Sequence, residues 1–362
     1  MRGGGVRQGQ AAGSDAASQA TRDHPKGSYI ACPSNEHAAP IDSRPARGLA
    51  RQASRSSYCV SPCSHGVMDR GRDDSPFYHL KDCMPELPEA EVAARQLRAR
   101  LIGAQVADVL VGRDDIIREG GATNVWYPGS VVSGVERYGK SVVIEFQKSG
   151  DLRYLVAELG MTGLLLLPAV SIRFPQHVHY TMQFNAVATS SLRYWNPRRF
   201  GRLSLLDRAG LDRYRVRRFG CDPLRVTCEE FIQLLQHSRR RVKTVLMHQQ
   251  VIAGIGNIYA NEALFQARLH PDAIASQLAP SAASRLHQAM QSILRHAIEC
   301  GGSSVKDFFA PDGSEGTYKQ HHLVYGKEGL PCPQKCGGVI RRVQSERSSF
   351  ICTTCQKIRT RR

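Results

Sequence analysis

The feature that most limits the fold of this 362-residue chain is an abrupt change of composition at Met84. Residues 1–83 are rich in Gly, Ser, Ala, Arg and Pro and show little apolar periodicity. A segment of this kind cannot bury enough apolar surface to offset the entropy that ordering costs. We therefore expect a disordered leader, with the fold built from residues 84–362.

Residues 84–206 predict one helix followed by a run of short strands. From Glu89 onward, apolar residues recur at helical spacing, with Pro88 in the first turn and Gly103 at the end. The next segments, to about Leu206, are rich in β-branched and aromatic residues and are separated by Gly, Pro and Asn. This pattern predicts an antiparallel β-sandwich or barrel led by a helix.

The rest of the chain predicts a second, helical domain and a short tail. We interpret residues 207–224 as a linker. Residues 225–300 return to helical periodicity, and a polar, Gly-rich stretch that follows them indicates a loop or lid. The prediction is thus an α+β multidomain protein with domains at 84–206, 225–329 and 330–362.

Four cysteines dominate the tail, arranged as Cys332-x3-Cys336 and, after fifteen residues, Cys352-x2-Cys355. Two close thiolate pairs separated by a hairpin-length span match a tetrahedral zinc ribbon, although the first pair is one residue wider than usual. A tail this short cannot fold by burial alone, so metal would supply much of its folding energy. Four unrelated cysteines are the alternative. We expect one structural Zn²⁺ and no redox or nucleotide cofactor.

The net charge of +17 favours a polyanionic partner, nucleic acid above all. Residues 1–83 carry 11 Lys and Arg against 8 Asp and Glu, so +14 of the charge belongs to residues 84–362. No stretch approaches 18 uninterrupted apolar residues, and the opening residues lack the apolar core of a secretory signal. We expect a cytoplasmic monomer without membrane contact; a merely basic soluble protein is the alternative.

Two loops could contact nucleic acid. Gly254–Asn257 (GIGN) precedes a helical segment, where glycines let helix amides approach a phosphate; an ordinary helix turn explains it equally. Asn196–Gly201 (NPRRFG) combines two guanidinium groups with a ring that could wedge between bases while an arginine pairs with a base edge. An exposed basic turn with a core phenylalanine is the alternative.

Pro85 and Glu86 directly follow Met84. If Met84 were the first residue and were removed, Pro85 would carry a free secondary amine with a pKa of ~8. Such an amine can attack a carbonyl-equivalent carbon and form an iminium, with Glu86 as general acid or base. A proline that starts a helix and is followed by acidic residues is the structural alternative, which the residues alone favour.

Five motifs occur in order: MPELPEAEV at Met84–Val92, GMTG at Gly160–Gly163, NPRRFG at Asn196–Gly201, GIGNIYANEALF at Gly254–Phe265, and the cysteine tail. In these motifs the chain from Met84 onward resembles the formamidopyrimidine-DNA glycosylases, bacterial enzymes that repair oxidised purines in double-stranded DNA. The resemblance implies a β-sandwich, a helix-two-turn-helix domain and a zinc hairpin.

The resemblance also implies catalytic roles. Pro85 would attack C1′ of the damaged nucleotide and displace the base, while Glu86 would assist ring opening and proton transfers. Lys140 would contact the phosphate beside the lesion, and Glu89 matches a further active-site carboxylate. Successive β- and δ-elimination from the iminium would leave a one-nucleotide gap.

The DNA-binding residues that the resemblance implies are Met161, Arg198, Phe200, Asn257, Lys306 and Arg347. The first three match the trio that fills the void left by the extruded nucleotide, with the arginine facing the orphaned cytosine. Asn257 and Arg347 match residues that bind phosphates. Gly313–Tyr325 matches a mobile loop that covers the flipped base.

The chain departs from the family at Glu158, where a histidine is common and a carboxylate would repel phosphate, and in the Cys332–Cys336 spacing. With residues 1–83 attached, the Pro85 nitrogen is an amide and cannot act as a nucleophile. We therefore expect Met84 to be the true start, or processing to expose Pro85.

Three other functions fit parts of the sequence: an endonuclease VIII acting on oxidised pyrimidines, a non-catalytic DNA-binding protein on the same scaffold, and a zinc-ribbon transcription factor. The PELPE opening and the set Met161, Arg198 and Phe200 favour the purine enzyme. The cysteines occupy only the tail, which disfavours the transcription factor.

Overall fold

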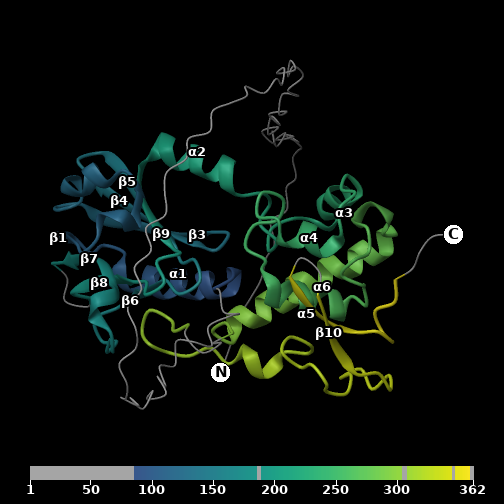
Figure 1. Cartoon of the computed structure of the whole chain (residues 1–362). Helices are drawn as coiled ribbons and strands as arrows, with labels where there is room; N and C mark the ends of the chain where they lie inside the picture. The colour runs from purple at the N-terminus through teal and green to yellow at the C-terminus, as the bar shows by residue number, and fades with distance from the viewer. Residues whose placement is uncertain (1–84, 186–188, 304–307, 345–346, 359–362) are drawn as a thin grey trace, which may run out of the picture. The chain divides into compact units, whose positions relative to one another are not determined.

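The computed structural model describes residues 85–185, 189–303, 308–344 and 347–358 (Figure 1). The first element is helix α1 (Leu87–Leu101), with proline in its first turn. It ends just before Gly103, whose φ of 83° lies in the left-handed region that glycine adopts without strain. The predicted leading helix is therefore present.

Two β-sheets follow, with strand orders β2-β9-β5-β4-β3 and β1-β7-β8-β6. The strands are β1 (Val106–Val111), β2 (Ile117–Glu119), β3 (Val131–Tyr138), β4 (Ser141–Lys148), β5 (Asp151–Glu158), β6 (Leu164–Leu166), β7 (Val178–Phe184), β8 (Ser191–Trp195) and β9 (Arg202–Asp207). Each predicted strand segment is present. The short β2 was not predicted, and it pairs with β9 in parallel, whereas the other pairs of these two sheets are antiparallel.

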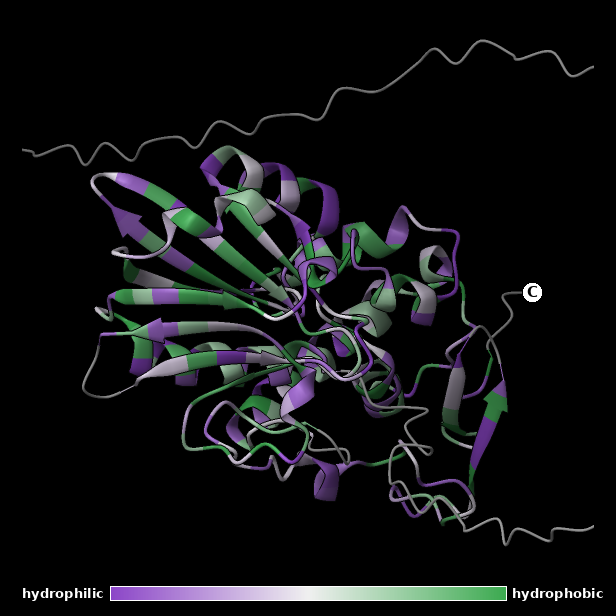
Figure 2. Cartoon of the chain, turned by 60° about the vertical axis from the view of Figure 1, so that its left-hand side comes forward, coloured by the Kyte–Doolittle hydropathy of each residue, from purple (hydrophilic) through white to green (hydrophobic). Residues whose placement is uncertain are grey.

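The two sheets enclose one apolar core, and Figure 2 shows their strands as two layers. Phe146 of the first sheet and Met182 of the second are fully buried in it. Helix α1 contributes Leu97 and Leu101 to the same cluster. The helix is thereby fixed at the head of the sandwich, which sets the position of the residues that precede it.

Five further helices follow: α2 (Arg208–Arg218), α3 (Cys228–Gln236), α4 (Val242–Met247), α5 (Asn257–Gln266) and α6 (Pro280–Glu299). Short 3₁₀ turns are η2 (Asp114–Ile116), η3 (Gly121–Trp126), η4 (Pro175–His177), η5 (Ala275–Gln277) and η6 (Tyr318–His321). The tail forms a hairpin of β10 (Ile340–Gln344) and β11 (Ser348–Cys352). No helix among the described residues has the length and apolar character needed to cross a membrane.

Helix α2 lies within the segment that we interpreted as a linker. The Asp207 carboxylate caps it by accepting from the amide of Gly210 at 2.7 Å. Leu211 and Tyr214 are buried against Val156 of the sheet. The sequence did not predict this helix, because the segment is rich in arginine and only these few apolar residues mark its buried face.

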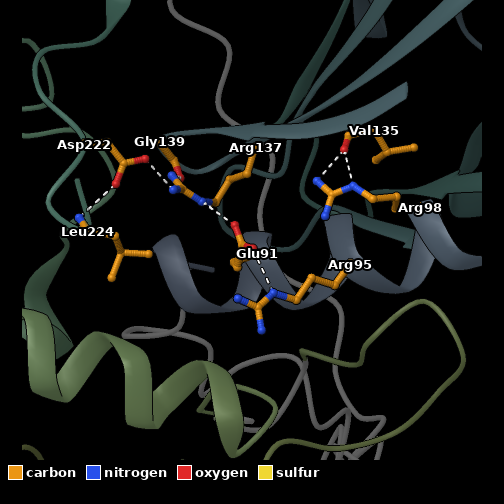
Figure 3. A network of polar contacts seen from close by, with 8 residues as sticks. All are labelled: Glu91, Arg95, Arg98, Val135, Arg137, Gly139, Asp222 and Leu224. Atoms are coloured by element: carbon orange, nitrogen blue, oxygen red, sulfur yellow. Dashed lines mark hydrogen bonds and ion pairs between the residues drawn. The ribbon is translucent and has the colours of Figure 1, made fainter. Parts of the chain in front are cut away.

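A second apolar cluster unites α3 to α6, and Leu87 of α1 belongs to it. A buried arginine reinforces the junction (Figure 3). Arg137 of β3 donates to Glu91 of α1 at 2.9 Å and to Asp222, which precedes α3, at 2.5 Å. Burial opposes ionisation of Glu91, yet hydrogen bonds from Arg95 and Arg137 lower its pKa. Arg137 therefore ties the sandwich to the helical region.

Replacing Arg137 by methionine should lower the free energy of unfolding by about 3–5 kcal/mol, because two partly buried carboxylates lose their shared cation. Arg95→Met is the matched control: its partner is also Glu91, but its side chain is 57% exposed, so we expect a loss of at most about 1 kcal/mol. Urea unfolding at pH 7 measures both. Equal losses in the two variants would show that burial of this contact contributes nothing.

Candidate active site

The carboxyl group of Glu86 occupies the N-terminus of α5. It accepts hydrogen bonds from the amides of Gly256 at 2.8 Å, Ile258 at 2.9 Å and Tyr259 at 3.4 Å. Pro85, directly before it, is also buried. The sequence had suggested that these helix amides approach a phosphate; in the structure they donate to a carboxyl group of the same chain.

The environment of Glu86 favours its protonated form. Only 2% of the residue is exposed. Burial raises the pKa of Glu86 from its ordinary value near 4.5 to about 7; Lys140 and the amide hydrogen bonds oppose this rise, and Glu89 adds to it. Near neutral pH this group can therefore donate or accept a proton, as a general acid or base must.

Glu89 is also buried, and its carboxyl group accepts hydrogen bonds from three other residues. It accepts from the amides of Glu86 at 2.8 Å and Ser303 at 2.7 Å, and from the hydroxyl of Tyr259 at 2.6 Å. Burial raises the pKa of Glu89. Ser303 in turn contacts His322 at 2.8 Å, and burial lowers the pKa of that histidine to about 4. Glu89 thus holds α1 against both α5 and the chain that follows α6.

Gly256 explains how Lys140 and Glu86 come together. A β-carbon at Gly256 would lie 2.4 Å from the carboxyl carbon of Glu86 and 2.7 Å from the Nζ of Lys140. Only glycine leaves room for both groups at the end of α5. Burial lowers the pKa of Lys140, and the neighbouring Glu86 opposes this change. The carboxyl group of Glu86 and the amino group of Lys140 therefore lie together in one compact site.

The Lys140 side chain also borders a cleft of about 360 Å³ with a cationic lining. Arg241, Lys243 and Arg347 contribute to its wall. Arg347 precedes β11 and is exposed, whereas Lys243 is buried and donates to Ser348 and Ser349 of β11, each at 2.8 Å. The structure therefore brings together Lys140 and Arg347, which are far apart in the sequence, along one positively charged surface.

Asn257, the first residue of α5, is held from within that helix. Its side-chain oxygen accepts from the side-chain Nδ2 of Asn261 at 3.2 Å, and the Oδ1 of Asn261 accepts from the backbone amide of Phe350 at 2.8 Å. The helix and the tail hairpin are thereby joined. Lys306 lies outside the described residues.

Met161 lies on the loop between β5 and β6, and Arg198 and Phe200 lie on the loop between β8 and β9. The loops touch because the amide of Arg198 donates to the hydroxyl of Thr162 at 3.4 Å. The guanidinium of Arg198 lies over the ring of Phe200, 5.0 Å from its centre, and that ring is 57% exposed. The solvated ring contradicts the alternative of a core phenylalanine and is available to insert between bases.

Glu158 does not present an uncompensated negative charge. Its carboxylate accepts from Arg118 at 2.9 Å, Arg218 at 2.7 Å and the hydroxyl of Tyr214 at 2.9 Å. Together with Lys140 and Arg217, it borders a further cleft of about 370 Å³. The two guanidinium groups offset the phosphate repulsion that we expected from the sequence.

The four cysteines of the tail converge. Their sulfur atoms all lie within 4.8 Å of one another, with Cys332 and Cys355 3.7 Å apart and Cys336 and Cys352 3.5 Å apart. The wider first pair is accommodated by a turn in which Lys335 adopts a φ of 52°. Four thiolates at this spacing fit a tetrahedral zinc ion.

The fold and these sites together define a three-domain protein with a cationic cleft and a buried acid at its leading helix. Models of known families match each domain: the formamidopyrimidine-DNA glycosylase N-terminal domain at residues 84–203, the H2TH domain at 219–309, and the zinc finger found in FPG and IleRS at 329–358. The chain belongs to the formamidopyrimidine-DNA glycosylase family, which confirms the resemblance and the predicted fold class.

Individual relatives agree with this assignment. The formamidopyrimidine-DNA glycosylase of Solibacter usitatus is 36% identical over 277 residues, which span 76% of this chain and all of that protein. A Lactococcus lactis FPG mutant in complex with Fapy-dG-containing DNA has a TM-score of 0.69 at 30% identity, over 75% of this chain and 100% of that one. The FPG protein of Thermus thermophilus has a TM-score of 0.66 at 35% identity, and the match covers 76% of this chain and 100% of that one.

Proposed function

We propose that this protein is a bifunctional DNA glycosylase and AP lyase of base excision repair, which excises oxidised purines and cleaves the strand by β,δ-elimination. We propose further that it works as a monomer on cytoplasmic, nucleoid-associated DNA. The observation that carries the catalytic proposal is the carboxyl group of Glu86. It is buried, has a pKa near neutrality, directly follows Pro85 and lies beside Lys140.

The proposed reaction needs a secondary amine at Pro85. Its nitrogen attacks C1′ of the extruded nucleotide and the bond from C1′ to the base breaks; the base leaves with the bonding electrons and takes up the proton that the amine loses. Protonated Glu86 gives its proton to the sugar ring oxygen as the ring opens, and an iminium forms between Pro85 and C1′. The iminium acidifies the C2′ protons, so loss of one of them expels the 3′ phosphate, and a second elimination releases the 5′ phosphate.

The amine requirement leads us to propose that Pro85 is the first residue of the working form. The match to the family's N-terminal domain starts at Met84, which supports this proposal. Glu89 would hold α1 in position against α5. Lys140, Asn257 and Arg347 would hold the phosphates around the lesion, while Met161, Arg198 and Phe200 would fill the space it leaves. Lys306 stays a proposed DNA-binding residue, as the resemblance implies.

The substrate class is tested with matched duplexes that carry 8-oxoguanine, a formamidopyrimidine or an oxidised pyrimidine. We expect single-turnover excision of both purine lesions to exceed that of the pyrimidine. The reverse order would assign an endonuclease VIII activity. Tight binding without excision, by a chain that begins at Pro85, would identify a non-catalytic DNA-binding protein.

Arg347→Ala should weaken binding to all duplexes equally and reduce the slope of log K against log salt by about 1, because one phosphate contact is lost. Arg342, an exposed arginine of β10 outside the cationic cleft, supplies the control Arg342→Ala. Binding measured across a salt series gives the slopes. An unchanged slope for Arg347→Ala would remove this residue from the phosphate-binding surface.

We propose one structural Zn²⁺ on Cys332, Cys336, Cys352 and Cys355, with no redox or nucleotide cofactor. Cys352→Ser should lose the bound zinc, expose the amides of β10 and β11 to hydrogen exchange and weaken DNA binding at least ~10-fold, since metal supplies the folding energy of such hairpins. Cys228→Ser, at a half-buried thiol of α3, should change none of these. Retained zinc in Cys352→Ser would contradict the ligand set.

A further inference from the structure

A second group of metal-binding side chains lies at the C-terminal end of α6. His296 and Cys300 are one helical turn apart, since the amide of Cys300 donates to the carbonyl of His296 at 3.0 Å. His321 comes from the separate turn η6. One ligand atom of each side chain lies within 4.8 Å of the other two, and the two imidazole centres are 4.7 Å apart. None of these three residues takes part in a chemical step of the proposed repair reaction, although His321 belongs to the Gly313–Tyr325 segment that the resemblance assigns to the base-covering loop.

The three donors suit a zinc ion. Zinc bonds of about 2.0–2.1 Å to nitrogen and 2.3 Å to sulfur place tetrahedral ligand atoms roughly 3.3–3.6 Å apart. The separations in the structure, which are at most 4.8 Å, must therefore shorten by up to roughly 1.5 Å. His296 and His321 are both exposed, so rotation of their side chains can supply this change. Two imidazoles and a thiolate select zinc over magnesium or calcium, and water can complete the coordination.

The backbone already holds the two ligand-bearing segments together. The amide of Thr317 donates to the carbonyl of Cys300 at 2.8 Å, and that of Tyr318 donates to Gly302 at 3.1 Å. A β-carbon on Gly316 would lie 2.1 Å from the carbonyl oxygen of Gly302, so only glycine allows this approach. Because the segments are prearranged, a metal ion orders few additional groups when it binds.

We propose that His296, Cys300 and His321 form a second zinc site, distinct from the four-cysteine site. The bound ion links the end of α6 to η6 and restrains the chain between Gly316 and His322. The inference rests on the positions of these side chains alone. It holds whether or not the proposed repair activity does.

The test uses the full chain with its four-cysteine site loaded with zinc, titrated with Co²⁺. We expect one additional equivalent to bind, with the visible bands of tetrahedral cobalt and the charge-transfer band of a single thiolate. Cys300→Ser should remove the charge-transfer band. His321→Ala should weaken binding of this equivalent at least about tenfold, since even hydrogen-bond partners of metal ligands are worth 10–100-fold.

Two controls match these variants. Cys228→Ser removes a half-buried thiol at the start of α3, and His237→Ala removes an exposed histidine directly after that helix; each should leave the second equivalent intact. Added zinc should also slow hydrogen exchange at residues 317–322 in the wild type but not in His321→Ala. The proposal would be overturned if the wild type bound no second equivalent of Co²⁺, or if His321→Ala bound it with unchanged affinity. Circular dichroism checks that each variant remains folded.

Discussion

A chain that begins at Pro85 should form a covalent adduct with 8-oxoguanine duplex in the presence of borohydride, whereas the full chain should form none. An amide nitrogen has no lone pair available for attack at C1′, so the iminium that borohydride reduces cannot arise. We expect strand cleavage to fall by more than about 10³-fold, the scale on which removal of a catalytic nucleophile acts.

The sharpest control adds a single glycine before Pro85, which blocks the amine with the smallest possible extension. Both forms should still bind duplex containing an uncleavable abasic-site analogue, because the cationic cleft does not depend on the amine. An adduct whose intact mass includes residues 1–83 would refute the proposed nucleophile.

Glu86→Gln should slow base excision by about 10²–10⁴-fold while leaving duplex binding unchanged. Glutamine keeps an oxygen that can accept from the α5 amides but has no proton to transfer. Single-turnover excision and binding to an uncleavable analogue separate the two effects. Gln96→Glu, a change at a half-buried position of α1, controls for altered charge. Excision at the wild-type rate would remove Glu86 from the mechanism.

The same variant tests the raised pKa of Glu86 through stability. The folded chain binds this proton more tightly than the unfolded chain, so its stabilising contribution is complete below pH 4.5 and disappears as the pH rises through about 7. Between pH 4.5 and 8 the wild type should lose about 3 kcal/mol relative to Glu86→Gln. Any pH-independent cost of the substitution cancels in this comparison, and parallel stability curves would contradict the raised pKa.

Local patterns predicted the elements of the fold well. Runs of β-branched and aromatic residues marked strands such as β4 and β7, and the cysteine spacing marked the metal-binding hairpin, because each signal involves neighbours in the sequence. Helix α2 escaped this reasoning because its buried face carries too few apolar residues to produce a periodic signal.

The residues alone suggested Pro85 and Glu86 as a reactive pair, whereas Glu89 and Lys140 entered the prediction only through the family's motifs. The hydrogen bonds from Gly256 and Ile258 to Glu86 span about 170 positions, and no local periodicity reports a contact at that separation. The arginine partners of Glu158 and the meeting of His296 with His321 were missed for the same reason. Such contacts depend on how the elements pack, which sequence spacing does not encode.

The capping of α5 by Glu86 has a consequence for control of the chemistry. The acid belongs to the helix that heads the sandwich, while the amides around it belong to the helical domain. If the two domains separated, water would reach the carboxyl group and its affinity for the proton would return to that of an ordinary glutamate. In such an open molecule Glu86 would be ionised at neutral pH, so only the closed arrangement would supply its proton to a substrate.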